Sequence, residues 1–376
     1  MNMLTKFSVK NYKQFEDEIV FDLSAGNYSF NPECVKNGTV RTALIYGVNG
    51  TGKSNLGWAI FDMVEHLTDN ESKSLPSKHY VNANSSKNLV EFTSHFSFKH
   101  RKSSYKVEYR YSKDNNGIII SESLFIDGKN MVSYEKGSPF SVTLEGTEHL
   151  NKNINPSQNL SVLKYIHSNT NLDRRKKYNS LFICFMDFVN HMLWFRNVMD
   201  GIQYVGYRLD DKNIYQSILD NSNLKDFETF LNKSGISCQL DELHSDDNST
   251  IAFKFGKKRI KFGSIASTGT KSLAIFYYWW QQLKINKTPL LFLDEFDSSF
   301  HFKLSSSIVE KLKELENTQV ILTTHNTHLL NNDLIRPDCG FIINGKQIKA
   351  LHKSTEKELR EAHNLEKLYK AGAFNV

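Results

Sequence analysis

Apolar and polar residues follow two spacings along this chain, and each spacing predicts a different kind of structure. In residues 4–23 and 88–126 apolar positions alternate with polar ones, which is typical of strands with one buried face. Residues 115–117 (NNG) indicate a hairpin turn inside the second stretch. From residue 264 onward, short apolar runs alternate with segments of helical spacing. Strands that alternate with helices form parallel sheets covered on both faces, so this part predicts an α/β fold.

The elements expected after residue 264 can be placed from these spacings. We predict helices at 270–284 and 303–316, strands at 289–295 and 319–324, a helix near 327, a strand pair at 340–351 and a terminal helix at 356–370. A further buried strand is predicted at 42–46, followed by an amphipathic helix.

The middle of the chain has a different pattern. Residues 127–170 are polar and predict loops or weak strands, and residues 171–234 predict helices. The most apolar segment, 181–195, contains polar residues and is too short to span a bilayer, so we expect a buried or partner-facing helix there. Residues 249–263 predict a hairpin. We therefore expect an N-terminal lobe (1–130), a mostly helical insertion (131–248) and a C-terminal lobe (249–376).

Composition narrows the class of protein. Of the 376 residues, 39% are hydrophobic and 23% are charged, which is typical of a soluble globular protein. The net charge of +6 permits a nucleic-acid partner without requiring one. The four cysteines form no C-x-x-C pair, so we expect neither a zinc site nor a disulfide scaffold. The N-terminal residues lack an apolar signal core, and we expect a cytoplasmic protein.

The segment LIYGVNGTGKSNL, residues 44–56, contains the pattern G-x-x-x-x-G-K-[ST] between a predicted strand and a predicted helix. Glycines let backbone N–H groups turn inward around phosphate oxygens, and the positive end of the helix faces the same phosphates. Lys53 can reach the β- and γ-phosphates, and the Ser54 hydroxyl can ligate Mg²⁺. The predicted nucleotide contacts in this loop are Asn49, Gly50, Thr51, Gly52, Lys53, Ser54 and Asn55.

A phosphate-binding loop also needs a carboxylate near the metal and a group that activates water. Residues 290–295 (LLFLDE) predict a buried strand whose carboxyl end carries two adjacent acids. Asp294 would face the Mg²⁺ shell, and Glu295 would act as the general base for the attacking water. The sequence therefore predicts an ATPase.

Together these motifs resemble the ABC-type ATPase heads of the structural-maintenance-of-chromosomes (SMC) and overcoming-lysogenization-defect (OLD) group. Residues 267–272 (STGTKS) stand where that family has its signature loop, and residues 294–301 resemble its D-E-P-x-x-x-L-H run. His325 ends a predicted strand as the family's switch histidine does. Residues 363–374 resemble the tail of small OLD-like ATPases from bacterial abortive-infection and anti-phage systems. The resemblance covers about 1–65 and 260–376.

The resemblance implies a P-loop NTPase of the ABC-ATPase head type, with an antiparallel β subdomain and a helical insertion. In this group two heads sandwich two ATP molecules with Mg²⁺. Ser267, Thr268 and Gly269 would meet the γ-phosphate bound to the partner subunit, and His325 would sense that phosphate. The protein is thus expected to form a homodimer that depends on ATP, with a higher oligomer left open.

The chain departs from the family pattern at three points. Thr268 interrupts the usual signature wording, and Phe296 replaces the proline after the acidic pair. A glutamine for the Q-loop cannot be placed, because Gln14, Gln158 and Gln203 all lie in unconvincing contexts.

Other features carry weaker indications. The aromatic run 277–280 (YYWW) is more typical of core packing than of base stacking, and the basic runs 174–177 and 257–259 are more typical of solvated charge than of nucleic-acid contacts. His325 and His328 lack a third ligand at zinc spacing.

Four hypotheses follow for function. The leading one is an ATP-dependent switch in anti-phage defence that controls a separate effector encoded nearby, because no TOPRIM-like nuclease domain is expected after His325. The alternative is a DNA-binding repair or recombination ATPase of SMC-like type. A transporter subunit and a scaffold that only binds ATP are the remaining two.

Overall fold

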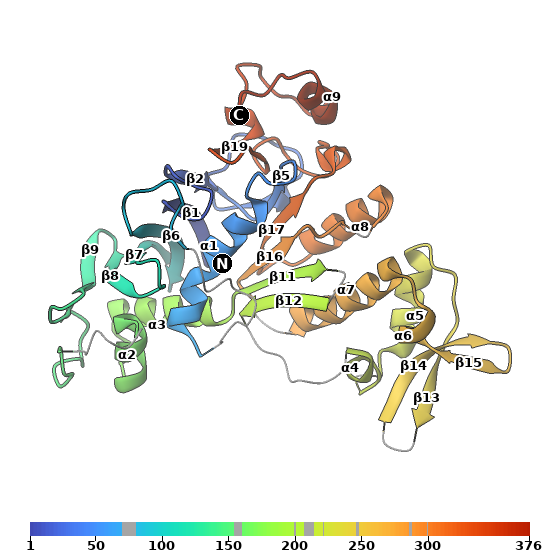
Figure 1. The fold of residues 1–376 in the computed structure, drawn as a ribbon, viewed down its shortest axis with the longest axis horizontal. Helices are drawn as coiled ribbons and strands as arrows, with labels where there is room; N and C mark the ends of the chain where they lie inside the picture. Colours follow the sequence, from blue (N-terminus) through green and yellow to red (C-terminus); the bar gives the residue numbers. More distant parts are fainter. Residues whose placement is uncertain are drawn as a thin grey trace.

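The described strands of the protein form two large sheets and two small ones, of three and two strands; Figure 1 shows the fold of this computed structural model. The structure describes residues 1–69, 80–153, 160–198, 201–206, 214–220, 222–245, 248–285, 288–298 and 300–376. Among these residues, no helix combines the length and the apolar composition needed to cross a bilayer.

The first sheet is antiparallel and has the strand order β10-β9-β8-β7-β6-β1-β2. Its strands are β1 (Met3–Lys10), β2 (Ile19–Asp22), β6 (Val90–His100), β7 (Ser103–Lys113), β8 (Ile119–Ile126), β9 (Lys129–Glu135) and β10 (Ser141–Val142). The expected meander is confirmed, and residues 115–117 lie in the turn between β7 and β8. Alternate residues of β6 are buried, as the alternating pattern predicts for a sheet with one covered face.

The second sheet brings together strands from all parts of the chain in the order β12-β11-β16-β17-β5-β18-β19. Its strands are β5 (Thr42–Tyr46), β11 (Leu193–Val198), β12 (Gly201–Gly206), β16 (Leu290–Asp294), β17 (Gln319–Thr324), β18 (Gly340–Ile343) and β19 (Ile348–Ala350). The five inner strands are mutually parallel, and every residue of β5, β16, β17 and β18 is buried. The carboxyl ends of β5, β16 and β17 therefore meet at one edge of this sheet.

Helix α1 (Lys53–Leu67) lies between the two large sheets (Figure 1). Gly57 lets it approach the parallel sheet, because a Cβ there would stand 2.8 Å from the side chains of Phe292 and Trp194. On its other side, Asp62 accepts a hydrogen bond from Tyr111 of the first sheet at 3.0 Å. The helix after the glycine loop is thus held by both sheets.

The predicted helix over 181–195 is wrong at its end. Helix α3 (Lys177–Asn190) stops before Leu193, and residues 193–198 form β11, which pairs in parallel with β16. In the extended form Trp194 is fully buried beneath α1, and the backbone bonds to a strand that would otherwise be a sheet edge. The expected helical stretch 171–234 is therefore interrupted by the β11–β12 hairpin.

A helix at Val162–Asn169 lies within 127–170, where loops or weak strands were predicted, because it buries apolar residues on one face. The remaining elements otherwise mostly follow the predicted pattern. They are α2 (Val162–Asn169), α4 (Ile214–Asp220), α5 (Leu224–Lys233), β13 (Leu240–Ser245), β14 (Asn248–Phe255), β15 (Lys258–Lys261), α6 (Phe262–Ile265), α7 (Thr268–Ile285), α8 (Phe302–Lys313) and α9 (Leu365–Lys370), with β3 (Val35–Lys36), β4 (Thr39–Val40) and the 3-10 helices η1 (Pro32–Cys34), η2 (Thr327–Leu329) and η3 (Leu351–Lys353). The predicted helix near 327 is only a 3-10 turn, and the predicted terminal helix begins at Leu365 rather than at 356.

A second, smaller core lies under the three-stranded sheet β13–β15. Phe227, Ile251, Phe262, Leu273 and Tyr277 pack there and are buried. The other three residues of the aromatic run 277–280 belong to the main core, which confirms that this run packs inside the protein. Helix α7 thus contributes to both cores.

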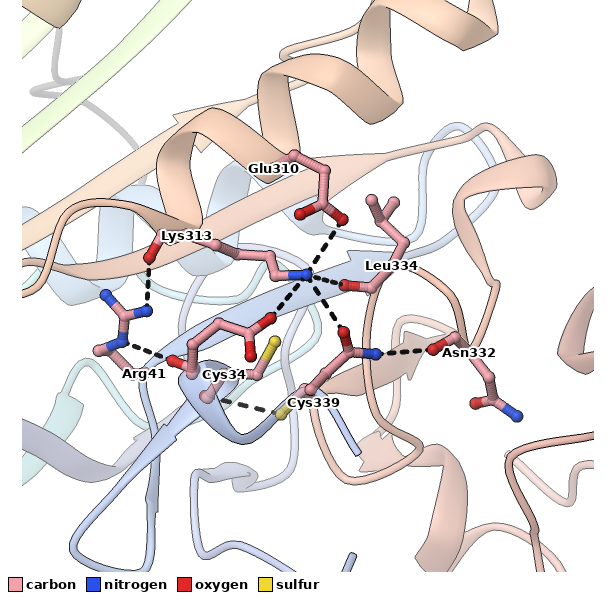
Figure 2. A network of polar contacts seen from close by, with 9 residues as sticks. Cys34, Arg41, Glu310, Lys313, Asn332, Leu334 and Cys339 are labelled. Carbon is pink, nitrogen blue, oxygen red and sulfur yellow. Dashed lines mark hydrogen bonds and ion pairs between the residues drawn. The ribbon is translucent and has the colours of Figure 1, made fainter. Parts of the chain in front are cut away.

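A buried ammonium group joins α8 to the N-terminal part of the chain (Figure 2). Lys313 Nζ lies 2.8 Å from Glu33 Oε1, and it donates to Glu310 and to the Leu334 carbonyl at 3.0 Å. Beside it, Arg41 donates to the Lys313 carbonyl at 2.7 Å. These contacts fix the far end of α8 against η1 and the 331–339 loop.

Candidate nucleotide site

The glycine loop lies between the buried strand β5 and α1, as the sequence predicts. Gly50 and Gly52 adopt φ values of +81° and +95°, which disfavour a side chain, and Gly52 immediately precedes the first residue of α1. A Cβ at Gly52 would also stand 2.6 Å from Gln14 Nε2 and 2.7 Å from the Phe15 ring. The positive φ values and the close neighbours of Gly52 favour residues without a side chain, so the backbone N–H groups stay accessible at the positive end of the helix.

Lys53 is buried and lies against the loop itself. Its Nζ donates to the carbonyl of Gly47 at 2.8 Å and to that of Val48 at 3.1 Å. Burial lowers the pKa of Lys53, while the charges of Glu295 and Asp294 act in the opposite direction. The ammonium group and the two carboxylates therefore share one electrostatic environment, although they come from distant parts of the chain.

Asp294 ends β16 and is almost fully buried. The Thr323 hydroxyl donates to Asp294 Oδ1 at 2.7 Å and accepts from the Glu295 N–H at 2.8 Å. Burial raises the pKa of Asp294, and hydrogen bonds from Ser54 and Thr323 oppose that rise. The effect of Ser54 on this pKa indicates that the two predicted metal ligands lie near each other.

These residues suit a magnesium ion that also binds phosphate. Asp294 Oδ2 is buried and has no hydrogen-bond partner among the described residues, so one hard oxygen ligand remains available to a metal ion. Within the part of the chain that the structure describes, no cluster of three or more histidine, cysteine or acidic side chains could hold a metal alone. A site with few protein ligands fits Mg²⁺, which keeps water and substrate oxygens in its shell.

Arg196 is a site residue that the sequence reasoning missed. It stands on β11 in register with Asp294; its Nη2 lies 2.5 Å from Glu295 Oε2 and its Nε 3.7 Å from Asp294 Oδ2. Glu295 has a left-handed backbone, with φ +47°. The aromatic pair Trp194 and Phe195 could have indicated a strand, but the apolar run before it favoured a continuous helix.

Residues after the carboxylate pair join the ends of β16 and β17. Asp297 is buried and accepts a hydrogen bond from the Thr324 hydroxyl at 2.8 Å. Burial raises the pKa of Asp297, and the hydrogen bond from Thr324 and the nearby charge of His325 oppose this. His325 is exposed and follows β17 directly, so it lies at the same sheet edge as the carboxylates. His328 instead lies 3.1 Å from Glu366.

The signature-like residues lie at the start of α7. The Ser267 hydroxyl accepts from the Thr270 N–H at 3.2 Å, and Ser267 and Thr268 are exposed. Among the described residues, no hydrogen bond or ion pair joins Ser267, Thr268 or Gly269 to the glycine loop or to the acidic pair of the same chain. The structure therefore brings together the loop, the carboxylates and the strand end, but not the signature.

Gln14 contacts the glycine loop, although its sequence context gave no such indication. Its Nε2 donates to the Gly50 carbonyl at 3.2 Å, and its Oε1 accepts from Asn55 at 2.9 Å. The other two candidates for the Q-loop cannot be compared with it, because Gln158 and the side chain of Gln203 lie outside the described residues.

Three of the large apolar side chains that are exposed stand beside these motifs. Val48 in the glycine loop is 55% exposed, Ile265 just before Ser267 is 48% exposed, and Phe302 just after His301 is 43% exposed. Exposed apolar groups next to polar functional loops are typical of surfaces that become covered by a partner.

A family model matches most of the chain. The model of a family described as "AAA domain, putative AbiEii toxin, Type IV TA system" matches residues 43–331, which include the glycine loop, the acidic pair and His325. A comparison with curated proteins found no significant match.

Solved structures of SMC heads are similar in fold. An Smc head domain with a coiled coil and joint from Pyrococcus yayanosii has 12% identity and a TM-score of 0.50, over 99% of this chain and 100% of that chain. A head with an extended coiled coil, bound to the C-terminal domain of ScpA and derived from Pyrococcus furiosus, has 12% identity and a TM-score of 0.48, over 94% and 98%. The SMC head domain from Thermotoga maritima has 16% identity and a TM-score of 0.42, over 92% and 98%.

Proposed function

The chain belongs to the AAA-domain family of AbiEii toxin type, and from this premise we propose that it is a nucleotide-dependent switch that controls a separate effector protein in anti-phage defence. Its fold is that of an SMC-like ABC ATPase head, as predicted from the sequence, and its class is an ATPase of the AAA and SMC-head type. ATP hydrolysis, dimerisation, the effector and the role in defence are parts of the proposal.

The observation that carries the proposal is the meeting of the glycine loop with the acidic pair. Ser54 lies close enough to Asp294 to oppose the rise in the pKa of that carboxyl, and the charges of both carboxylates act on the pKa of Lys53. Mg²⁺ held by Ser54 and Asp294 would offset the charge of the ATP phosphates. Lys53 would leave the loop carbonyls for the β- and γ-phosphates, because an ammonium group gains more from an anion than from neutral carbonyls.

Glu295 would accept the proton of the attacking water. Its Oε2 accepts from Arg196, so the guanidinium would hold this carboxylate in place beside the water. Thr323 supports the backbone at this point, because one hydroxyl contacts both Asp294 and the Glu295 N–H.

The exposed side chains Val48, Ile265 and Phe302 support a head dimer that forms across ATP. Each adjoins a motif that would meet the partner: the glycine loop, the Ser267 loop and the segment after Asp297. Ser267, Thr268 and Gly269 would then contact the γ-phosphate held by the other subunit, and His325 would sense it from the same subunit. Loss of the γ-phosphate would remove the shared contact and weaken the dimer.

The test measures ATP binding by calorimetry, turnover by phosphate release, and mass by light scattering with and without ATP and Mg²⁺. We expect Lys53→Ala to abolish ATP binding. Glu295→Gln should bind ATP and remain dimeric, while its turnover falls by about 10²–10⁴. The exposed Glu356→Gln is the matched control and should behave like the unchanged protein. Turnover that survives Glu295→Gln would contradict the role of Glu295 as general base, and ATP binding without turnover in the unchanged protein would favour the scaffold that only binds ATP.

The link to an effector is tested by co-purification with the products of neighbouring genes in the ATP-bound and ADP-bound states. Failure to co-purify in any nucleotide state would contradict the proposal of a separate effector, but it would not contradict the proposed ATPase activity.

The alternative is a DNA-binding ATPase, and exposed Lys257 and Lys258 at the β14–β15 turn favour it. The run 174–176 gives it less support, because its side chains pair with surface acids such as Asp173 and Glu145. DNA-stimulated turnover that weakens steeply with salt would support this alternative over the effector.

A further inference from the structure

A pocket of about 560 Å³ lies between α5, α7 and α8, away from the glycine loop. Figure 1 shows α5 and α7 side by side, with α8 next in the same part of the molecule. Its volume falls within the range of sites that hold small organic ligands. The nucleotide loop contributes none of its lining residues, so it is a separate site.

The inner wall of this pocket is aromatic and apolar. Trp280 and Ile308 are buried and line it, together with the partly buried Phe230. Phe276 holds this wall in place, because its ring stacks with Trp280 at 6.3 Å and with Phe230 at 6.2 Å between centroids. A wall of fixed rings favours a ligand with a planar or apolar part.

The rim of the pocket is strongly basic. Four lysines line it: Lys233, Lys284, Lys303 and Lys311. Lys284 Nζ and Lys311 Nζ both lie over the Trp280 ring, at 5.2 and 5.3 Å from its centroid. Within the described part of the chain, none of the four forms an ion pair with a carboxylate. Like charges gathered around a concave wall repel one another, and an anion between them would relieve that repulsion.

The one acid in the described lining of the pocket does not neutralise these lysines. Asp226 Oδ2 accepts from the Tyr277 hydroxyl at 2.7 Å and from Gln281 Nε2 at 3.0 Å. Its charge is thus directed at the neutral groups of α7. Elsewhere in the protein lysines find partners, as Lys353 does with Asp22 at 2.7 Å.

We propose that this pocket binds a small organic phosphate with a planar apolar part, the chemistry of a nucleoside monophosphate or an aryl phosphate. The planar part would lie against the wall formed by Phe230 and Trp280, and the phosphate would lie among the ammonium groups of Lys284 and Lys311. Ammonium groups on flexible stems suit a phosphate without requiring a fixed hydrogen-bond geometry. This second site goes beyond the nucleotide loop and does not depend on it.

The position of the pocket also predicts an effect on ATP turnover, and this part rests on the proposed function. Its wall α7 begins next to Ser267, and His301, which lines the pocket, closes the segment that follows Asp294. A ligand that contacts both helices would change their spacing and thereby the two segments that meet ATP in the dimer.

The experiment measures binding of AMP by calorimetry to the Lys53→Ala protein, in which the glycine loop is disabled. We expect saturable binding of one AMP per chain, tighter than that of adenosine or inorganic phosphate alone. The double substitution Lys284→Gln with Lys311→Gln should weaken AMP binding at least about tenfold. The charge-matched control, Lys102→Gln with Lys136→Gln in exposed turns, should not change it. A second pair, Lys233→Gln with Lys303→Gln, should also weaken binding, and thermal unfolding checks that each variant is folded.

Two results would overturn the site. One is the lack of saturable binding of both AMP and 1-naphthyl phosphate up to about 1 mM. The other is equal affinity in the pocket pair and the control pair, which would assign binding to an adventitious surface. ATP binding to the unchanged protein is measured separately, so a failed pocket and a failed glycine loop give different results. If AMP binds but leaves ATP turnover unchanged, the effect on turnover is contradicted and the site stands.

Discussion

The ion pair between Asp62 and Lys113 allows a sharp test of how α1 is held. Lys113 Nζ lies 2.8 Å from Asp62 Oδ2, and the two side chains are 1% and 2% exposed. The Tyr111 hydroxyl donates to the same oxygen at 3.0 Å, and the ammonium lies over the Tyr80 ring at 5.6 Å. The pair joins the helix that begins at Lys53 to strand β7 of the first sheet.

The substitution Lys113→Met keeps the length of the side chain and removes its charge. Asp62 is then left as an uncompensated buried carboxylate, which costs about 3–5 kcal/mol of unfolding free energy. A typical domain has about 5–15 kcal/mol in total, so about a fifth or more of the stability would be lost. The added change Asp62→Asn removes the uncompensated charge and keeps an oxygen for the Tyr111 hydroxyl. We expect it to recover at least half of the loss.

Lys353 and Asp22 provide the matched control, because they lie 2.7 Å apart with 44% and 41% of their side chains exposed. Water screens this pair, and Lys353→Met should cost less than about 1 kcal/mol. The assay is urea unfolding followed by circular dichroism and tryptophan fluorescence. The reasoning fails if Lys113→Met costs no more than Lys353→Met, or if Asp62→Asn adds its own cost instead of offsetting the first.

Two further predictions follow from the nucleotide site. Gly52→Ala should weaken ATP binding at least about tenfold in calorimetry, because the added Cβ meets Gln14 and Phe15. The control is Gly128→Ala, where φ is +78° and the space around the added Cβ is open. This control carries only the backbone cost of about 1–2 kcal/mol and should leave ATP binding unchanged. Burial raises the pKa of Asp294 above its ordinary 3.8, so the folded protein holds this proton more tightly than the unfolded chain and loses stability as the pH rises from 3.8 through the raised value. Without Mg²⁺ and nucleotide, Asp294→Asn should therefore be more stable than the unchanged protein at pH 8, by about 1.4 kcal/mol for each unit of pKa shift, and the difference should shrink as the pH falls toward 4; an equal or lower melting temperature at pH 8 would contradict this.

The secondary structure around the candidate site was predicted correctly where it lies in one contiguous stretch of sequence. The glycine loop, its flanking strand and helix, and the acidic end of β16 each follow from local spacing. Arg196 and Gln14 were missed because their roles depend on partners 99 and 36 residues away along the chain. The sequence on either side of Arg196 and of Gln14 contains no motif that indicates nucleotide binding.

The middle of the chain shows the same division between local and long-range information. The hairpins and most helices follow from periodicity, whereas the strand at 193–198 exists because β16 offers it a partner. An apolar run that continues a helix and one that starts a buried strand have the same composition, and only tertiary pairing separates them. The pocket between α5, α7 and α8 likewise depends on the packing of segments that no local pattern relates.

Helix α7, which packs in both hydrophobic cores, couples two regions of unequal size. The small core can open by local unfolding at a lower free energy than the large one, and amide hydrogens of β13, β14 and α5 should exchange with solvent earlier than those of β5 and β17. Each such opening would release one flank of α7 while its tryptophans stay anchored. The segment around Ser267 would thereby sample alternative orientations without global denaturation.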